Sequence, residues 1–163
     1  MIFEPLGDHD RSVFVCGTPE LDRYFQTQAS QDARRKVATP FVMVDETRRV
    51  LGYYTLSAYG VRAGELSPEV IRKLPRYPLL PATLLGRLAV HQDFRGKGLG
   101  SLILMDALRR SWKNTTEVAS VGVVAEAIDE NAHQFYLHHQ FLSFDQHPDR
   151  LFIAMGTLAK LFR

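Results

Sequence analysis

Residues 84–101 run from an apolar strand through a glycine-rich turn into a helix, an order that suits the binding of phosphate groups. Glycines at 96, 98 and 100 remove three Cβ atoms, so backbone N–H groups can converge closely on an anion. A helix expected over 99–112 adds the unpaired N–H groups of its first turn and the positive end of its dipole. Arg95 and Lys97 supply full positive charges. The segment is therefore expected to hold a diphosphate.

Two other phosphate-binding loops are weighed against this interpretation. A nucleoside-triphosphate loop fails, because His91 stands five residues before Gly96 and the lysine after Gly96 is followed by glycine instead of a hydroxyl residue. A dinucleotide fingerprint would use Gly96, Gly98 and Ser101, with Glu117 near the required acidic position. Too little chain follows for that doubly wound fold. The remaining alternative is a turn that only packs a strand against a helix.

The length and composition are those of one ordinary globular domain. The chain has 163 residues, 45% hydrophobic and 23% charged, which is enough for a single core over residues 1–163. Its net charge of +2 and pI of about 8.8 fall short of the strongly basic balance of a dedicated nucleic-acid binder. No apolar run approaches the roughly eighteen residues that span a bilayer, and the N-terminus is acidic. We therefore expect a cytoplasmic protein.

The cysteine and histidine content argues against a metal centre. Cys16 is the single cysteine, which excludes an internal disulfide, and we expect it to pack in the core. Histidines 133, 138, 139 and 147 form no HExxH arrangement with carboxylates. No metal site is predicted.

The elements that position the glycine-rich turn follow from propensity and periodicity. A helix is expected over 19–34, with Thr18 as N-cap and Pro19 at its first position. The remaining expected elements are strands over 39–44 and 51–58 joined as a hairpin, a short helix over 68–73, a strand over 83–90, a helix over 99–112, a strand over 118–124, a helix over 130–138 and a strand over 151–155. This order predicts an α/β protein of mixed α+β type, with helices on both faces of the sheet.

The segment Arg95-Gly96-Lys97-Gly98-Leu99-Gly100 fits Arg/Gln-x-x-Gly-x-Gly, and so resembles the pyrophosphate-binding signature of Gcn5-related N-acetyltransferases (GNAT). Over almost its whole length the chain is similar to the GNAT-fold toxins of bacterial type II toxin–antitoxin modules. The segments that carry this likeness are Phe14-Val15-Cys16-Gly17 with Leu21-Asp22, Gly52–Ser57, Leu74–Pro78, Leu85–Val90, Asp106–Arg110 and Phe135-Tyr136.

The resemblance implies a fold, a cofactor and partners. The fold would be a mixed, mostly antiparallel central sheet flanked by helices on both faces, and the cofactor acetyl-CoA. The reaction would acetylate the α-amino group of an aminoacyl-tRNA and block translation. A ribbon-helix-helix antitoxin would neutralise the protein and bind operator DNA, and homodimers are typical of such toxins.

The same resemblance implies where the reaction takes place, with Tyr136 as the catalytic residue. A phenol of pKa about 10 stays protonated at neutral pH and can donate its proton to a thiolate whose acid has a pKa near 8.5. The alternative is a purely structural role, as a core tyrosine with a hydrogen-bonded hydroxyl. The expected cofactor-binding residues are Leu88, Ala89, Val90, Arg95, Gly96, Lys97, Gly98, Leu99, Gly100, Ser101, Asn131 and Phe135, with an N–H near Val90 meeting the oxyanion.

No general base is selected by the spacing. The candidates by residue type are His91, Glu126, His133, His138 and His139. Because the α-amine of an amino ester has a pKa below the usual value of about 7.7–8.0, water can remove its proton. A lysine acceptor, with a pKa near 10.4, would need a true base.

Basic clusters are the expected contacts of an RNA substrate. Arg34, Arg35, Lys36, Arg76 and Arg87 are tentatively assigned to it, with solvated surface charge as the alternative. Two other functions remain open: acetylation of a protein lysine or small amine, and a catalytically silent acyl-CoA-binding co-repressor.

Three positions depart from the family pattern. His91 stands where the family often has aspartate, and Val124-Ala125-Glu126 replaces a common Val-Asp-Ala. Residues 137–141, Leu-His-His-Gln-Phe, replace the usual Glu-x-Phe-Gly-Phe after the tyrosine helix.

Overall fold

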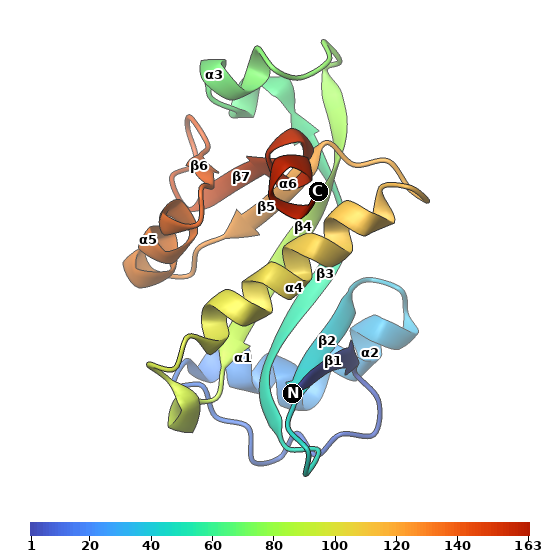
Figure 1. Ribbon diagram of the computed structural model, residues 1–163, viewed down its shortest axis with the longest axis vertical. Coiled ribbons are helices and arrows are strands. Elements are labelled where there is room, and N and C mark those ends of the chain that lie inside the picture. Colours follow the sequence, from blue (N-terminus) through green and yellow to red (C-terminus); the bar gives the residue numbers. More distant parts are fainter. The chain divides into compact units, whose positions relative to one another are not determined.

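The computed structural model describes residues 1–163, and the strands form one seven-stranded sheet in the order β1-β2-β3-β4-β5-β7-β6 (Figure 1). Two compact units share the chain: unit 1 comprises Met1–Ser57 and Gly86–Ala107, and unit 2 comprises Ala58–Leu85 and Leu108–Arg163. The strands are β1 (Ile2–Pro5), β2 (Thr39–Val44), β3 (Val50–Arg62), β4 (Leu79–Val90), β5 (Gly122–Glu126), β6 (Leu142–Ser143) and β7 (Arg150–Ala154). The helices are α1 (Pro19–Arg23), η1 (Tyr24–Gln28), α2 (Ala29–Arg34), η2 (Ala63–Glu65), α3 (Pro68–Ile71), η3 (Gln92–Phe94), α4 (Leu99–Asn114), α5 (Glu130–His138) and α6 (Met155–Phe162).

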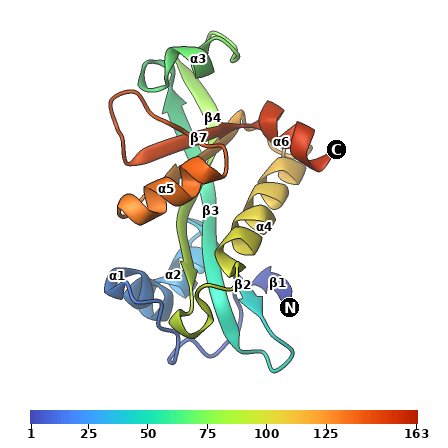
Figure 2. The ribbon, with the colours of Figure 1, turned by 60° about the vertical axis from the view of Figure 1, so that its left-hand side comes forward.

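The sheet is mixed and mostly antiparallel, as the resemblance implied. Strand β2 pairs antiparallel with both β1 and β3, and β7 pairs antiparallel with β5 and β6. Strand β4 pairs parallel with β5, in the register Thr83 to Val123. In unit 2, α5 lies beside β7, and α6 follows β7 and contacts β5 (Figure 2).

An aromatic cluster forms the core of unit 1. The Phe25 ring stacks on Tyr53 with centroids 4.4 Å apart, and Phe14 meets Phe25 edge-on at 5.0 Å. The Tyr53 hydroxyl donates to the carbonyl of Leu21 at 2.7 Å. These contacts attach the helical segment of residues 19–34 to β3.

The helix predicted over 19–34 is interrupted by a π-helical turn, η1. Tyr24 and Phe25, the first two residues of this turn, are both buried. Thr18 stands at the N-cap as predicted, but its side chain makes no capping bond. Its carbonyl accepts the Leu21 and Asp22 N–H groups instead.

Several element boundaries differ from the prediction. Strands β3 and β4 are longer than expected, while β5 begins at Gly122 because the residues after α4 continue as hydrogen-bonded turns, including Val118 N–H to Asn114 O at 2.9 Å. Helix α6 was not predicted, because its apolar residues continue the apolar run of β7. The short edge strands β1 and β6 were also missed. No helix is long and apolar enough to cross a membrane.

Cys16 packs in the core as predicted, at 4% exposure. Burial, with a smaller contribution from the hydrogen bond with Asp22, raises the pKa of the thiol from 9.0 to about 11. At pH 8 about one thiol in a thousand is ionised in the folded chain, against about one in ten when unfolded. We expect Cys16 to react with Ellman's reagent about 100-fold more slowly in the native protein than in guanidinium chloride. Equal rates would contradict this burial.

Candidate active site

The glycine-rich turn has the geometry of an anion cradle. Strand β4 ends at Val90, η3 follows, and α4 begins at Leu99. Gly96 and Gly98 both have φ of +76°, in the left-handed region, and a Cβ at either position would meet no atom within 4 Å. Gly100 lies inside α4, so two glycines and not three adopt positive φ. The space beside these glycines is open, and they directly precede the first turn of a sixteen-residue helix that carries no acidic residue there, which fits a diphosphate.

The cations of the turn are positioned by residues that no local sequence pattern connects to the turn. Gly17, with φ of +94°, lies so close to the Arg95 guanidinium that a Cβ would collide with it. The Lys97 ammonium lies over the Phe94 ring at 5.4 Å and the Arg49 guanidinium lies over the same ring at 4.9 Å. The segment containing Gly17 therefore gives the Arg95 side chain its space.

His91 caps the turn instead of serving as an accessible base. It is 5% exposed, and its Nδ1 accepts the Asp93 N–H at 3.1 Å. Its ring meets Phe14 and Phe94 edge-on. A side chain that accepts this N–H is what aspartate would supply at a helix start. The replacement of aspartate by histidine thus keeps the capping function.

Strand β4 has a free edge next to the turn. In the β4–β5 register, Leu85 pairs with Ala125 and β5 ends at Glu126, so residues 87–90 extend past the end of β5. The His91 N–H donates to Leu51 O of β3 at 2.8 Å. Because N–H groups alternate along a strand, those of Leu88 and Val90 point to the opposite, unpaired edge. Ala89 directs its own backbone groups toward β3.

Tyr136 is buried on α5, whose N-cap Asp129 accepts the Ala132 N–H at 2.8 Å. Its ring, 4% exposed, packs against Phe135 at 5.4 Å and Phe141 at 5.2 Å. The hydroxyl makes no hydrogen bond within the chain, and burial alone raises its pKa. The alternative of a core tyrosine with a hydrogen-bonded hydroxyl does not hold.

The other predicted residues of α5 and its neighbours are in the same unit as Tyr136. Asn131 is exposed in the first turn of α5, and Phe135 is half-buried. His133 shares a hydrogen bond with Ser143 Oγ at 3.0 Å, and His139 Nδ1 lies 2.8 Å from Phe135 O. His138 and Glu126 are exposed. Two of the four candidate bases here therefore hold local structure.

Gln140 occupies the place of the family's glycine after α5, with φ of +72°. An L side chain costs about 1–2 kcal/mol in this left-handed conformation. We expect Gln140→Gly to stabilise the protein by about 1 kcal/mol, measured as an increased urea midpoint. The control is Gln134→Gly in the middle of the same helix, which should destabilise it by about 1 kcal/mol. An unchanged or lowered urea midpoint in Gln140→Gly would show that the strain at Gln140 is absent.

The predicted substrate-binding arginines are only partly brought together. Arg34, Arg35 and Lys36 are exposed at the end of α2. The Asp32 carboxyl has a lowered pKa, first through the Gln28 hydrogen bond and also through the charges of Arg87 and Arg35. Arg35 and Arg87 are therefore neighbours of one carboxylate. Arg76 is exposed in unit 2.

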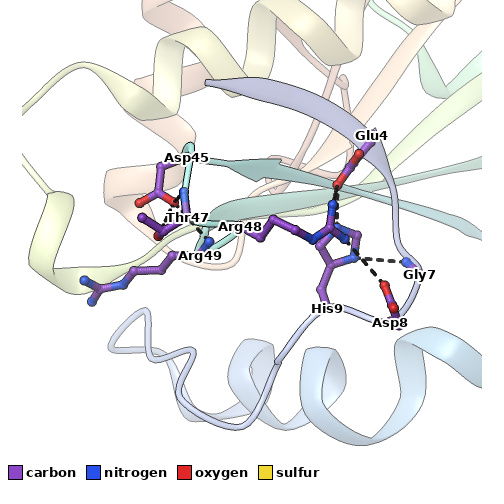
Figure 3. A network of polar contacts seen from close by, with 8 residues as sticks. All are labelled: Glu4, Gly7, Asp8, His9, Asp45, Thr47, Arg48 and Arg49. Atoms are coloured by element: carbon purple, nitrogen blue, oxygen red, sulfur yellow. Dashed lines mark hydrogen bonds and ion pairs between the residues drawn. The ribbon is translucent and has the colours of Figure 1, made fainter.

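Arg48 and Arg49, two further basic residues, are engaged in ion pairs. Arg48 contacts Glu4 and Asp8, each at 3.4 Å, and His9 lies beside Glu4 at 2.7 Å (Figure 3). Arg49 pairs with Asp93 at 3.2 Å. These arginines hold the N-terminal segment and the β2–β3 turn.

The fold and the turn define an acyltransferase of the GNAT class. Residues 38–142 match the family model described as "Acetyltransferase (GNAT) domain", and the chain belongs to this family. The chain is 30% identical to the "tRNA-acetylating toxin" of Mycobacterium tuberculosis, over 90% of this chain and 86% of the relative. It is 25% identical to "Probable toxin TacT" of Sinorhizobium fredii, over 98% of this chain and 94% of the relative.

Solved structures show the same similarity. AtaT complexed with acetyl-methionyl-tRNAfMet has a TM-score of 0.90 and 28% identity, over 99% of both chains. A tyrosine-to-phenylalanine mutant of KacT has a TM-score of 0.91 and 28% identity, over 99% of this chain and 98% of KacT. A tyrosine-to-phenylalanine mutant of AtaT, bound to the C-terminus of the antitoxin AtaR and acetyl-CoA, has a TM-score of 0.85 and 26% identity, over 99% of this chain and 97% of AtaT.

Proposed function

We propose that the protein is a toxin that transfers the acetyl group of acetyl-CoA to the α-amino group of an aminoacyl-tRNA. The observation that carries the proposal is the 30% identity to a tRNA-acetylating toxin over 90% of this chain. The open glycine turn and the unbonded Tyr136 hydroxyl supply groups that this chemistry requires. Blocking the α-amine of aminoacyl-tRNA would stop translation.

Different residues of the chain would bind the cofactor and donate the proton. Arg95–Ser101 would hold the pyrophosphate, and the free N–H groups of Leu88 and Val90 would bind the amide-bearing arm or the developing oxyanion. Asn131 and Phe135 would contact the same arm. Acetyl-CoA supplies an acetyl group already activated as a thioester, so no nucleophile of the protein is needed. Tyr136 Oη would donate a proton to the departing sulfur.

Partners and location follow the same relatives. AtaT binds the C-terminus of an antitoxin, and we propose that a ribbon-helix-helix antitoxin neutralises this chain and binds operator DNA with it. We further propose that residues 1–163 act as one catalytic domain, that two copies form a dimer, and that the protein acts in the cytoplasm. Arg34, Arg35, Lys36, Arg76 and Arg87 would contact the RNA.

The test is transfer of label from [¹⁴C]acetyl-CoA to charged total tRNA. We expect label on the aminoacyl group, released with the amino acid by mild base, and none on uncharged tRNA. Sequencing the labelled tRNAs would identify the acceptor. Label on protein lysines, or on no charged tRNA, would contradict the proposal.

A further inference from the structure

Arg87 is the one basic residue of β4, and it lies on an aromatic ring without a carboxylate partner. Its guanidinium carbon is 3.5 Å from the centroid of the Tyr24 ring. It forms no ion pair, whereas Arg48, Arg49 and Arg150 each pair with a carboxylate. The half-buried Arg87 lowers the pKa of the nearby Asp32 through its charge but forms no ion pair with it, so its N–H groups remain able to bind an anionic ligand.

The Tyr24 ring is itself fixed. Its hydroxyl donates to Asp32 Oδ2 at 2.7 Å, and Gln28 donates to the other oxygen of Asp32 at 3.1 Å. The ring also stacks with Tyr53, with centroids 6.5 Å apart and an angle of 20°. Burial, and then the bond with Asp32, raise the pKa of Tyr24 to about 12, so the ring stays neutral. The Asp32 carboxylate holds this ring and does not form an ion pair with Arg87.

Stacking leaves the hydrogen-bonding edge of Arg87 available. A guanidinium carries five N–H donors in its plane, and an aromatic ring against one face does not cover them. No nitrogen of Arg87 is buried without a partner, so the unbonded donors reach solvent. A planar fork of this kind matches two oxygens of a phosphate.

The position of Arg87 separates it from the glycine turn. It lies three residues before Val90 on an extended strand, about 10 Å further from the turn. An anion bound here is therefore not the one held by Arg95–Gly98. Arg35, the second basic neighbour of Asp32, and the exposed Arg34 and Lys36 add positive charge at the C-terminal end of α2.

We propose that Arg87, held over the Tyr24 ring, binds a phosphodiester of the single-stranded 3′ end of the acceptor RNA. The choice of RNA rests on the proposed function. The contact fixes the end of the RNA that carries the aminoacyl group, so it determines RNA affinity and not the chemical step. Tyr24 acts through Arg87 and is a positioning residue.

The test measures RNA binding directly. A fluorescein-labelled RNA hairpin ending in the acceptor 3′ sequence of tRNA is titrated with the full chain at several salt concentrations. We expect Arg87→Gln to weaken binding about tenfold and to lower the salt slope by about 0.7–0.9. Arg87→Lys should weaken binding about threefold, since lysine keeps the charge but lacks the planar set of N–H donors. Tyr24→Leu should weaken binding about fivefold, and Tyr24→Phe, which keeps the ring, less than twofold.

The matched control is Arg109→Gln. Arg109 also lies over an aromatic ring, that of Phe162 at 5.1 Å, but on unit 2 and exposed. The Arg109→Gln variant should bind the hairpin like the wild type. Equal losses in both variants would show non-specific attraction and overturn the proposal.

Failure of this inference is distinguishable from failure of the proposed function. Arg87→Gln that is folded by circular dichroism and binds the hairpin like the wild type overturns the phosphodiester site, even if charged tRNA is acetylated. Binding that depends on Arg87 without any acetyl transfer supports the site and refutes the transferase function. With active enzyme, we expect KM for charged tRNA to rise about tenfold in Arg87→Gln while kcat stays constant.

Discussion

Tyr136→Phe should reduce kcat for acetyl transfer roughly 10²- to 10⁴-fold, the range of a general acid. Its folding stability should stay within about 0.5 kcal/mol of the wild type, because the lost hydroxyl makes no hydrogen bond within the chain. The buried ring and its contacts with Phe135 and Phe141 are retained. The measurement pairs steady-state kinetics with urea unfolding.

The pH dependence of kcat tests the same group independently. Tyr136 must be protonated to donate, and burial raises its pKa above the ordinary value of 10.0, so the active form persists to higher pH. We expect no alkaline loss of kcat from Tyr136 up to about pH 9.5. A Tyr136→Phe enzyme that retains most of its kcat, or an alkaline limb below pH 9 that this variant removes, would contradict the assignment.

Gly98→Ala should raise the Kd for coenzyme A roughly 5- to 30-fold while leaving the protein folded. At φ of +76° an L residue costs about 1–2 kcal/mol, and each 1.4 kcal/mol transferred to binding is tenfold. The added Cβ meets no protein atom, so it points into the space that the phosphates would occupy. The melting temperature should fall by about 2–8 °C. Calorimetric titration and a thermal melt measure the two effects.

Gly64→Ala is the control for this substitution. Gly64 is similarly open, with nothing within 4 Å of a Cβ, but its φ is not positive and it lies in unit 2. The Gly64→Ala variant should bind coenzyme A like the wild type. Unchanged affinity in Gly98→Ala would show that the turn is a packing feature, the alternative that the sequence left open.

The features that sequence predicted well are those contained in one short segment. The glycine turn, the β2 hairpin strand and the helix of Tyr136 depend on residues within about ten positions of each other, and their local signals agree. The sequence did not predict helix α6 or the correct start of β5. Met155 and Val118 continue apolar runs, and only tertiary packing decides where those runs end.

Contacts between distant segments explain the parts of the site that sequence did not reveal. Gly17 and Arg95 are 78 positions apart, and Tyr24 and Arg87 are 63 apart, so no local pattern joins them. The free Tyr136 hydroxyl is likewise a property of its packed surroundings. Propensity describes each residue's preference, whereas these features depend on which neighbours the fold supplies.

The free edge of β4 also links the stability of the protein to its cofactor. Unpaired strand edges are templates for self-association, and the edge at residues 87–90 carries apolar side chains at three of its four positions. A ligand that lies along this edge acts as a missing strand and, at 100 times its Kd, adds about 2.7 kcal/mol to the stability of the native state. Acetyl-CoA bound along this edge would therefore cover the strand and stabilise the folded chain at once.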